Sequence, residues 1–289
     1  MRKITDIFKS QPITFSCEIF PPKTEQGYEN LKTTISEWAR LKPDFISCTY
    51  GAGGGNREKT LDIVQLIQNR HQIAGLAHLT CVLNTKQQIR EIVEDIKRRG
   101  VRNILALRGD PPLDNPNWQP GENNFRFSKD LCADIRLQYG DFFSIGAAGF
   151  PEGHILCKDR DRDAGYLKNK IENGAEFVIT QFFFDNADYF AYVERLRRIG
   201  VTARVIPGLL PITNYENMIK FCKMNGTTIT PQVKQIFEPI QNDPSATLKA
   251  GIAFAIQQSR ALLKGGAPGL HFYCLNKIHP TQEIWEAVL

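Results

Sequence analysis

The chain has 289 residues, of which 36 are Lys or Arg and 31 are Asp or Glu, so its formal net charge is only +5. This length suits one large globular domain, and so small a charge excess gives no reason to expect a nucleic-acid partner. No apolar run reaches membrane-spanning length and the first ten residues contain no apolar signal segment, so a cytoplasmic protein without a membrane partner is expected.

Eight short runs rich in Ile, Val, Phe or Thr recur along the chain, and most are followed by a stretch with helical periodicity. They lie at residues 13–22, 44–52, 75–81, 103–110, 142–152, 177–185, 203–213 and 269–277. Alternation of strands and helices indicates a parallel sheet covered by helices, and eight repeats favour its closed form, the (β/α)8 TIM barrel. Each run ends in polar residues, which such a barrel gathers at one mouth.

The intervening segments have the spacing of amphipathic helices. Three apolar stripes show it: Leu31, Ile35 and Trp38; Ile89, Ile92, Val93 and Ile96; and Ile284, Trp285 and Val288. Asn84 or Thr85 can cap the second of these helices, and Gly100, Gly174 and Gly200 suit the residue just beyond a helix end. Residues 214–266 are too long for one barrel helix and predict extra helices before the last strand.

Two loops and the seven cysteines bear on binding chemistry. The segment GAGGGNRE has Asn56 three residues after Gly53, so it fails the dinucleotide-loop spacing and is predicted to be a flexible mouth element. The long loop over residues 110–127 is typical of a functional lid. Seven scattered cysteines form no CxxC pair, which predicts reduced thiols and no metal site.

Glu18 lies within an otherwise apolar strand, shortly before Pro21 and Pro22. Desolvation there favours the protonated carboxyl group, as a general acid requires. The alternative is a structural carboxylate paired with a buried Arg or Lys.

Other candidates stand at the ends of later strands. Asp110 is either a carboxylate facing the mouth or a helix-capping or turn residue. His78 has no second metal ligand at a suitable spacing, so a hydrogen bond to a ligand or to the backbone is expected instead. Gln181 suits the donor-acceptor edge of a ring, and Phe221 is either a core residue or a stacking surface. An acid, a carboxylate, an amide and aromatic rings favour redox chemistry on a planar heterocycle with an organic cofactor.

The runs EIFPPK, TYGAGG, HLTC, ALRGDPP, ITQFFFD, IPGLLPI and HFYCLNK resemble, in order and spacing, those of the methylenetetrahydrofolate reductase family. The resemblance covers nearly the whole chain. It implies an FAD-dependent barrel that reduces 5,10-methylenetetrahydrofolate to 5-methyltetrahydrofolate with NADH or NADPH by ping-pong kinetics, supplying methyl groups for methionine synthesis. It also implies one catalytic domain over residues 1–289, without the regulatory domain of eukaryotic relatives, and a homo-oligomer as in bacterial relatives.

The resemblance also implies roles for single residues. Glu18 matches the general acid that protonates N10 of the folate, and Asp110 matches a carboxylate beside the flavin and the pterin. The positions matching folate contacts are Gln181, Phe221, Tyr273 and Lys277. Those matching FAD contacts are Thr49, His78, Arg108, Gly109, Asp110, Phe127, Ala148, Phe150, His154, Asp163 and Lys170.

Three positions depart from relatives. Lys277 stands where some carry Arg, and a lysine gives a point-charge contact in place of a two-pronged one. Phe127 and Phe150 stand where a bacterial relative has Tyr, so two hydroxyl groups beside the flavin are missing. Two other classes of protein fit the same barrel: a methyltransferase that binds methyltetrahydrofolate without a flavin, and a folate-binding barrel without catalysis.

Overall fold

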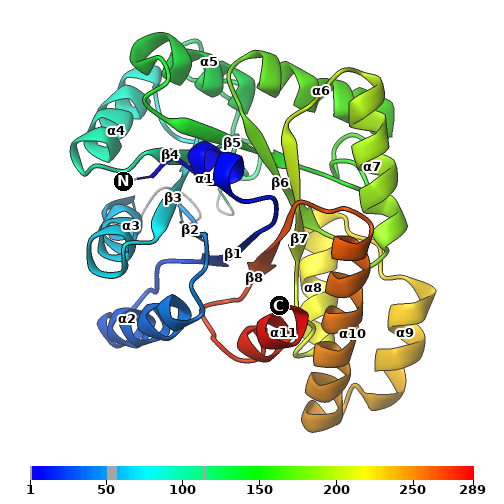
Figure 1. Cartoon of the computed structure of the whole chain (residues 1–289). Helices are drawn as coiled ribbons and strands as arrows, with labels where there is room; N and C mark the ends of the chain where they lie inside the picture. Colours follow the sequence, from blue (N-terminus) through cyan, green and yellow to red (C-terminus); the bar gives the residue numbers. More distant parts are fainter. Residues whose placement is uncertain (1, 51–56, 113–114) are drawn as a thin grey trace.

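A computed structural model describes residues 2–50, 57–112 and 115–289. Its centre is a closed barrel in which eight parallel strands follow each other in chain order and β8 pairs with β1, as the sequence predicted (Figure 1). The strands are β1 Thr14–Ile19, β2 Phe45–Cys48, β3 Ala74–Thr80, β4 Asn103–Leu107, β5 Ser144–Gly149, β6 Phe177–Phe182, β7 Arg204–Leu209 and β8 Gly269–Tyr273.

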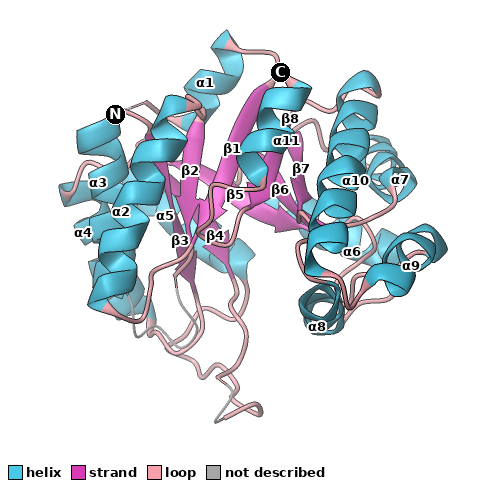
Figure 2. Ribbon diagram, turned by 90° about the horizontal axis from the view of Figure 1, so that it is seen from below, coloured by secondary structure: helices cyan, strands magenta, loops and turns pink. Residues whose placement is uncertain are grey.

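Helices surround this barrel (Figure 2). They are α2 Glu25–Arg40, α3 Arg57–His71, α4 Lys86–Arg98, α5 Ser128–Tyr139, α6 Arg160–Glu172, α7 Asn186–Arg198, α8 Tyr215–Asn225, α9 Pro231–Phe237, α10 Pro244–Lys264 and α11 Thr281–Val288, with the 3-10 helix η2 at Glu238–Ile240. The helices α8, α9 and α10 lie between β7 and β8, so the predicted extra helices before the last strand are confirmed. Thr85 caps α4 in a capping box with Gln88. Gly100, Gly174 and Gly200 have φ of 73°, 110° and 84°, the conformation expected beyond helix ends.

Strand alternation decides which side chains face the barrel interior. Phe15 packs on Trp285 of α11 with ring centroids 5.2 Å apart, and Cys17 and Ile19 belong to the same cluster between barrel and helices. Because successive side chains of a strand point to opposite faces, Ser16 and Glu18 of β1 point inward. The same alternation turns His78 of β3 and both His271 and Tyr273 of β8 toward the interior.

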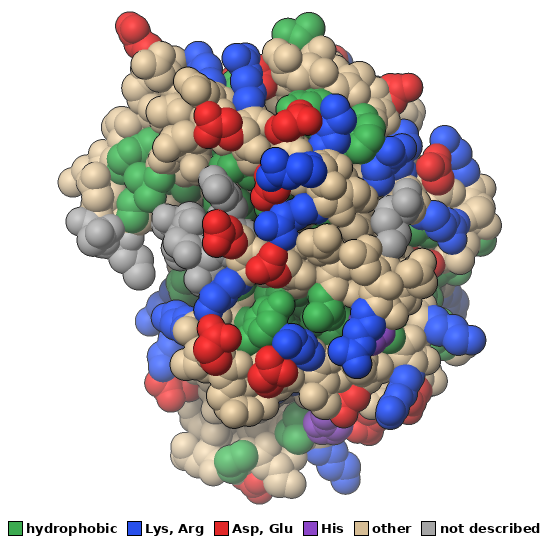
Figure 3. Space-filling model, turned by 90° about the vertical axis from the view of Figure 1, so that its left-hand side faces the viewer, with side chains coloured by type: hydrophobic (Ala, Val, Ile, Leu, Met, Phe, Trp, Pro, Cys, Tyr) green, Lys and Arg blue, Asp and Glu red, His purple; other side chains and the backbone are tan. Residues whose placement is uncertain are grey.

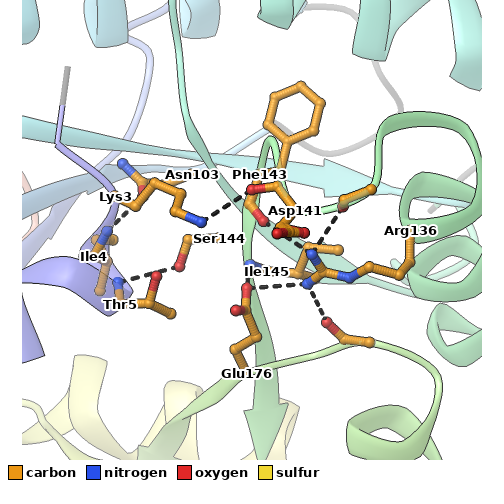
Figure 4. Close-up of polar contacts among 12 residues, drawn as sticks. Lys3, Ile4, Thr5, Asn103, Arg136, Asp141, Phe143, Ser144, Ile145 and Glu176 are labelled. Carbon is orange, nitrogen blue, oxygen red and sulfur yellow. Dashed lines mark hydrogen bonds and ion pairs between the residues drawn. The ribbon is translucent and has the colours of Figure 1, made fainter. Parts of the chain in front are cut away.

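A short helix that the sequence analysis did not predict, α1 Ile4–Ser10, closes the barrel at the end opposite the long loops (Figure 2). Ile4 and Ile7 are buried in one cluster with Leu76, Leu105 and other inward side chains of the lower barrel. The backbone N–H of Ile4 donates to Asn103 Oδ1 at 2.7 Å, and that of Thr5 donates to Ser144 Oγ at 3.3 Å (Figure 4). The helix α1 therefore covers the barrel floor, and the polar strand ends described below lie at the opposite end.

Beside this floor, one arginine joins three neighbouring segments. Arg136 Nη2 donates to Gly174 O at 2.7 Å and to Glu176 Oε2 at 3.0 Å, and that carboxylate accepts the backbone N–H of Ile145 at 3.1 Å (Figure 4). These contacts link α5 to β5 and to the segment just before β6, and so hold the three segments together at this end of the barrel.

The surface on the side of α2, α3 and α4 carries basic and acidic side chains interspersed with each other (Figure 3). Arg99, for example, lies 3.2 Å from Asp95 and also pairs with Asp62. Such mixed pairs are typical of a solvated helix face and contribute little stability each. Of the helices that the structure describes, none is both long and apolar enough to cross a membrane.

Candidate active site at the barrel mouth

Glu18 lies at the top of the barrel interior, and its side chain is 19% exposed. Its Oε2 atom is 3.4 Å from His78 Nε2 and 3.9 Å from His271 Nε2. Within the described parts of the chain, these two histidines, and no Arg or Lys, form its ion-pair contacts. The predicted alternative of a Glu18 paired with a buried Arg or Lys therefore has no counterpart among them.

The two histidines are deeply buried. His271 is 0% exposed and His78 6%, and neither Nε2 atom makes a hydrogen bond in the described structure. Burial lowers the pKa of His78, and neighbouring His271 lowers it further, while the Glu18 carboxylate opposes both effects. His78 is therefore neutral at physiological pH. No three His, Cys, Asp or Glu side chains of the described residues are grouped to hold a metal ion.

Tyr273 stands beside this acid on β8, where Glu18 and Tyr273 are register partners. Its hydroxyl donates to Thr180 O of β6 at 2.7 Å, which fixes the ring across the intervening strand β7. Burial raises the pKa of Tyr273 well above its ordinary value, and the charge of Glu18 adds to the shift. Tyr273 therefore offers Glu18 a neutral ring. Gln181, on the same β6, is partly buried, and its Oε1 accepts the N–H of Phe182 at 3.0 Å.

A second group of predicted residues gathers above β4 and β5. Arg108 Nη2 lies 3.8 Å from Asp110, whose side chain is 95% exposed and caps no helix. Burial lowers the pKa of His154, and the positive charges of Arg108 and Lys170 lower it further, whereas Asp110 opposes them. His154 therefore lies close enough to Arg108, Asp110 and Lys170 for their charges to act on it.

Lys170 and Asp163 of α6 form the inner part of this group. Lys170 Nζ donates to Ala148 O at 3.0 Å and lies 5.8 Å from the centroid of the Phe150 ring. Burial lowers the pKa of Lys170, and Asp163 counteracts the shift. Asp163 is 6% exposed, and burial raises its pKa to about 6 although Lys170 opposes the shift. A partly buried ammonium group beside an aromatic ring is a suitable contact for an anionic ligand.

Aromatic and glycine residues shape the remaining surface of the mouth. Phe150 packs edge-on against His154 at 4.7 Å, and Phe127 is 46% exposed. Gly109 has a φ of 79°, and a Cβ atom there would lie 2.6 Å from Val82 Cγ1, so only glycine fits. Phe150 thus sets a flat apolar ring beside the cation Lys170, a pairing suited to a cofactor that has both a phosphate group and a ring.

Three further predicted residues come from α8 and from the segments after β8 and β2. Phe221 of α8 is partly buried against the cluster that contains Phe182 and Phe184. Lys277 is exposed on the loop after β8. Thr49 follows β2, where its N–H donates to Ile19 O at 2.9 Å. The glycine-rich segment with Gly53 and Asn56 lies outside the described residues.

The lid-like loop after β4 is fastened to the start of α4. Lys86 N donates to Asn123 O at 2.7 Å, and Asn124 Nδ2 donates to Asn84 O at 2.8 Å. The loop reaches away from the barrel at the end opposite α1 (Figure 2). Its described part is thus held at its C-terminal half, beside the group around Arg108.

Ser16 and His271 were missed by the sequence analysis. Ser16 Oγ lies 2.8 Å from His271 Nδ1, and both residues are fully buried beneath Glu18. The available signal was strand alternation, because Ser16 shares a face with Glu18 and His271 shares one with Tyr273. Their proximity depends on the pairing of β1 with β8.

A family model described as methylenetetrahydrofolate reductase matches residues 3–288. The chain is 36% identical over 265 residues to 5,10-methylenetetrahydrofolate reductase of Pectobacterium carotovorum, covering 92% of this chain and 86% of that one. It is 36% identical to methylenetetrahydrofolate reductase 1 of Schizosaccharomyces pombe, covering 92% of this chain and 44% of the relative. Methylenetetrahydrofolate reductase (NADH) 1 of Arabidopsis thaliana is 35% identical, with coverages of 95% and 48%. The chain thus spans just under half the length of the yeast and plant relatives.

Among solved structures, a protein of Clostridium thermocellum that binds two copies of 5-methyl-5,6,7,8-tetrahydrofolic acid has a similar fold. Its TM-score is 0.63 at 15% identity, over 98% of this chain and 96% of that one. At this identity the likeness supports the barrel fold alone.

Proposed function

This chain belongs to the methylenetetrahydrofolate reductase family, and we propose that it reduces 5,10-methylenetetrahydrofolate to 5-methyltetrahydrofolate. In this proposal NADH or NADPH is the electron source, bound FAD passes the hydride on, and the two substrates react in turn by ping-pong kinetics. The product supplies methyl groups for methionine synthesis. The enzyme is expected to be a homo-oligomer, which light scattering of the purified protein would measure.

The position of Glu18 is the observation that supports this chemistry most. Opening the five-membered ring of the folate requires a proton at N10, and the acid that gives it must face the mouth. Glu18 is inward-facing and mostly buried, and its carboxyl group touches two histidines without an Arg or Lys among its described contacts. Such surroundings suit a carboxyl group that gives up a proton to a bound substrate.

The group above β4 and β5 is the proposed FAD site. When bound, FAD supplies two-electron hydride chemistry that no amino-acid side chain provides. Arg108 and Lys170 would hold the pyrophosphate, and Phe150 would provide a flat apolar surface. The other proposed FAD contacts are Thr49, His78, Gly109, Asp110, Phe127, Ala148, His154 and Asp163.

Asp110 has a separate proposed role at the edge of this site. Its exposed carboxylate, 3.8 Å from Arg108, is free to approach a ligand at the mouth. A negative charge there would oppose negative charge on the ring system of the cofactor. The carboxylate oxygens would also accept a hydrogen bond from the pterin amino group. The remaining proposed folate contacts are Gln181, Phe221, Tyr273 and Lys277.

The absorbance spectrum of the pure protein tests the proposal. We expect yellow protein with one FAD per chain, bleached anaerobically by NADH or NADPH and recoloured by 5,10-methylenetetrahydrofolate with formation of 5-methyltetrahydrofolate. Protein that stays colourless after addition of FAD would instead support a pterin-binding barrel such as a methyltransferase. Protein that takes up FAD but is bleached by neither nucleotide would contradict the proposed electron source.

A further inference from the structure

The strand β6 contains a bulge at its mouth end. Regular pairing with β7 ends at Ile179 and resumes three residues later, opposite a β7 residue only two positions further on. Thr180 and Gln181 therefore lie opposite the single β7 residue Pro207, and one of them is extra. A proline has no N–H to donate, and in a closed barrel without edges it fits inside a strand only at such a bulge.

The bulge reverses the side-chain alternation of β6. Ile179 packs in the cluster inside the lower barrel, whereas Phe183, four residues later, packs outward against Tyr189 of α7 with ring centroids 5.7 Å apart. Regular alternation would turn both side chains to the same face. Gln181 lies within the bulge, so the direction of its side chain depends on how the bulge is held.

Two hydrogen bonds from side chains fasten the bulge to the neighbouring strands. Thr180 Oγ1 accepts the N–H of Gly208 on β7 at 2.9 Å, and Thr180 O accepts the hydroxyl hydrogen of Tyr273 on β8 at 2.7 Å. Thr180 is fully buried, so no bulk water competes for either contact. The backbone of the bulge is thus held from β7 and, across β7, from β8.

Tyr273 reaches β6 because β7 carries a glycine in its path. A Cβ atom on Gly208 would lie 2.7 Å from Tyr273 Cε2 and 2.1 Å from Thr180 O, so only glycine fits there. Burial raises the pKa of Tyr273 well above its ordinary value, and the charge of Glu18 adds to the shift. The hydroxyl group therefore keeps the hydrogen that it donates.

One end of the Gln181 amide is already occupied. Its Oε1 accepts the N–H of Phe182 at 3.0 Å, and because an N–H can donate only to the oxygen, this contact also orients the amide. The NH2 group, with two donors, is the end left to meet a bound molecule. The acceptor atoms along the edge of a pterin ring are suitable partners for it.

We propose that Tyr273 is a positioning residue for Gln181: its hydroxyl holds the bulge through Thr180 O and so aims the Gln181 amide at the folate. This inference rests on the proposed folate contact of Gln181. The Tyr273 ring is still able to touch the folate, but its hydroxyl is committed to the backbone of β6. The hydroxyl therefore acts on folate binding through the strand.

Hydrogen exchange of the purified protein without folate tests the structural part of the proposal. Tyr273→Phe removes the hydroxyl and keeps the ring, so the amides of Phe182 and Gly208 should exchange about fivefold faster, the size of one ordinary hydrogen bond. Tyr189→Phe is the matched control, because Tyr189 is buried and its hydroxyl donates to Val205 O at 2.8 Å, away from the bulge. Equal changes in both variants, or none in Tyr273→Phe, would overturn the proposal.

Two threonine variants test the second hydrogen bond of the bulge. Thr180→Val keeps the shape of the side chain but removes the acceptor of the Gly208 N–H, so the same two amides should again exchange faster. Thr180→Ser keeps the hydroxyl and should stay close to wild type. Equal effects of the two substitutions would contradict a bulge held by hydrogen bonds.

A double-mutant cycle tests whether Tyr273 acts through Gln181. The dissociation constant of 5-methyltetrahydrofolate, measured by calorimetry, should rise in Gln181→Ala and should rise about fivefold in Tyr273→Phe. When Gln181→Ala is already present, Tyr273→Phe should add nothing. An equal further loss of affinity would show that the hydroxyl acts independently of Gln181, and it would overturn the proposal.

The binding measurements also separate this inference from the proposed function. Unchanged folate affinity in Gln181→Ala would overturn the inference even in an active reductase, because there would be no contact to position. The expected affinities and exchange rates in a protein that reduces no folate would support the inference and contradict the proposed function.

Discussion

Asn276 pairs with both backbone polar groups of Phe20, since its Nδ2 donates to Phe20 O and its Oδ1 accepts from Phe20 N, each at 2.8 Å. Phe20 directly follows β1 and Asn276 lies in the turn after β8, so the pair continues the seam between these strands beyond the end of the sheet. Glu18 lies two residues before Phe20. The amide therefore fixes the backbone that places the proposed acid.

Asn276→Gly should lower the free energy of unfolding by about 1–2 kcal/mol, because two hydrogen bonds are lost at a partly buried position. Glycine keeps the backbone conformation, since Asn276 has a φ of 60°. Leu275→Gly is the control, because Leu275 has a φ of 51° and makes no side-chain hydrogen bond. Urea unfolding of both variants measures the difference, and equal stabilities would show that the Asn276 amide contributes nothing.

Glu18→Gln should separate the two half-reactions. Hydride transfer from the nicotinamide needs no proton on the folate, so its rate should stay within a few-fold of wild type. Folate reduction should fall by about 10²–10⁴-fold, because glutamine has nearly the same shape but no acid proton. Stopped-flow measurement on folded protein gives the rate of each half-reaction. Equal losses of rate in both would point to a structural role for the Glu18 carboxylate.

Asp110→Asn should raise the midpoint potential of bound FAD. Removal of one partly screened negative charge corresponds to about 1 kcal/mol, or about 20 mV for a two-electron couple. Folate reduction should slow more than reduction by the nucleotide. Anaerobic redox titration measures the potential, and an unchanged value would place this exposed carboxylate away from the flavin ring.

Asp163 should make the apoprotein less stable as pH rises from about 4 to about 6. Because burial raises its pKa to about 6 from an ordinary 3.8, the folded state holds this proton where the unfolded state has lost it. The resulting loss approaches about 1.4 kcal/mol per pH unit, up to about 3 kcal/mol, and stays constant above pH 6.

Asp163→Asn lacks this titration, so its stability relative to wild type should rise across the same window. Unfolding curves at several pH values provide the test. A difference between the two proteins that does not vary with pH would refute the raised pKa.

Asn103→Ala should destabilise the barrel floor by about 2–4 kcal/mol. The fully buried amide accepts from Ile4 N and donates to Gly75 O at 3.0 Å, and each buried group left unpaired costs about 1–3 kcal/mol. Ser144→Ala, which removes only the 3.3 Å contact to Thr5 N, should cost under about 1 kcal/mol. Thermal unfolding compares them, and equal costs would contradict an anchoring role for Asn103.

The barrel was predictable because each strand is a short apolar run, and the polar residues at its ends mark where it begins and stops. Mouth residues such as Glu18 and Tyr273 were found for the same reason, since polar side chains at strand ends stand out. The helix α1 was not predicted, because seven residues offer too few positions for a helical period. Its stability comes from Asn103 and Ser144, about a hundred or more positions away in the sequence.

The layer beneath the mouth was not predictable in the same way. A serine or histidine inside an apolar run suits a buried space-filling role, and nothing local marks it as a partner of an acid. Ser16 and His271 are separated by 255 positions and meet only when β8 pairs with β1. Their relationship is a property of barrel closure rather than of either segment.

The sealed floor has a consequence for the order of events during synthesis. Ile4 needs Asn103, Thr5 needs Ser144, and the carbonyl groups of Phe8 and Gln11 need Arg204. Ile4 and Ile7 therefore stay without their full packing partners until β6 and β7 have been made. The segment Ile4–Ser10 reaches its place only when the strands that it covers have assembled.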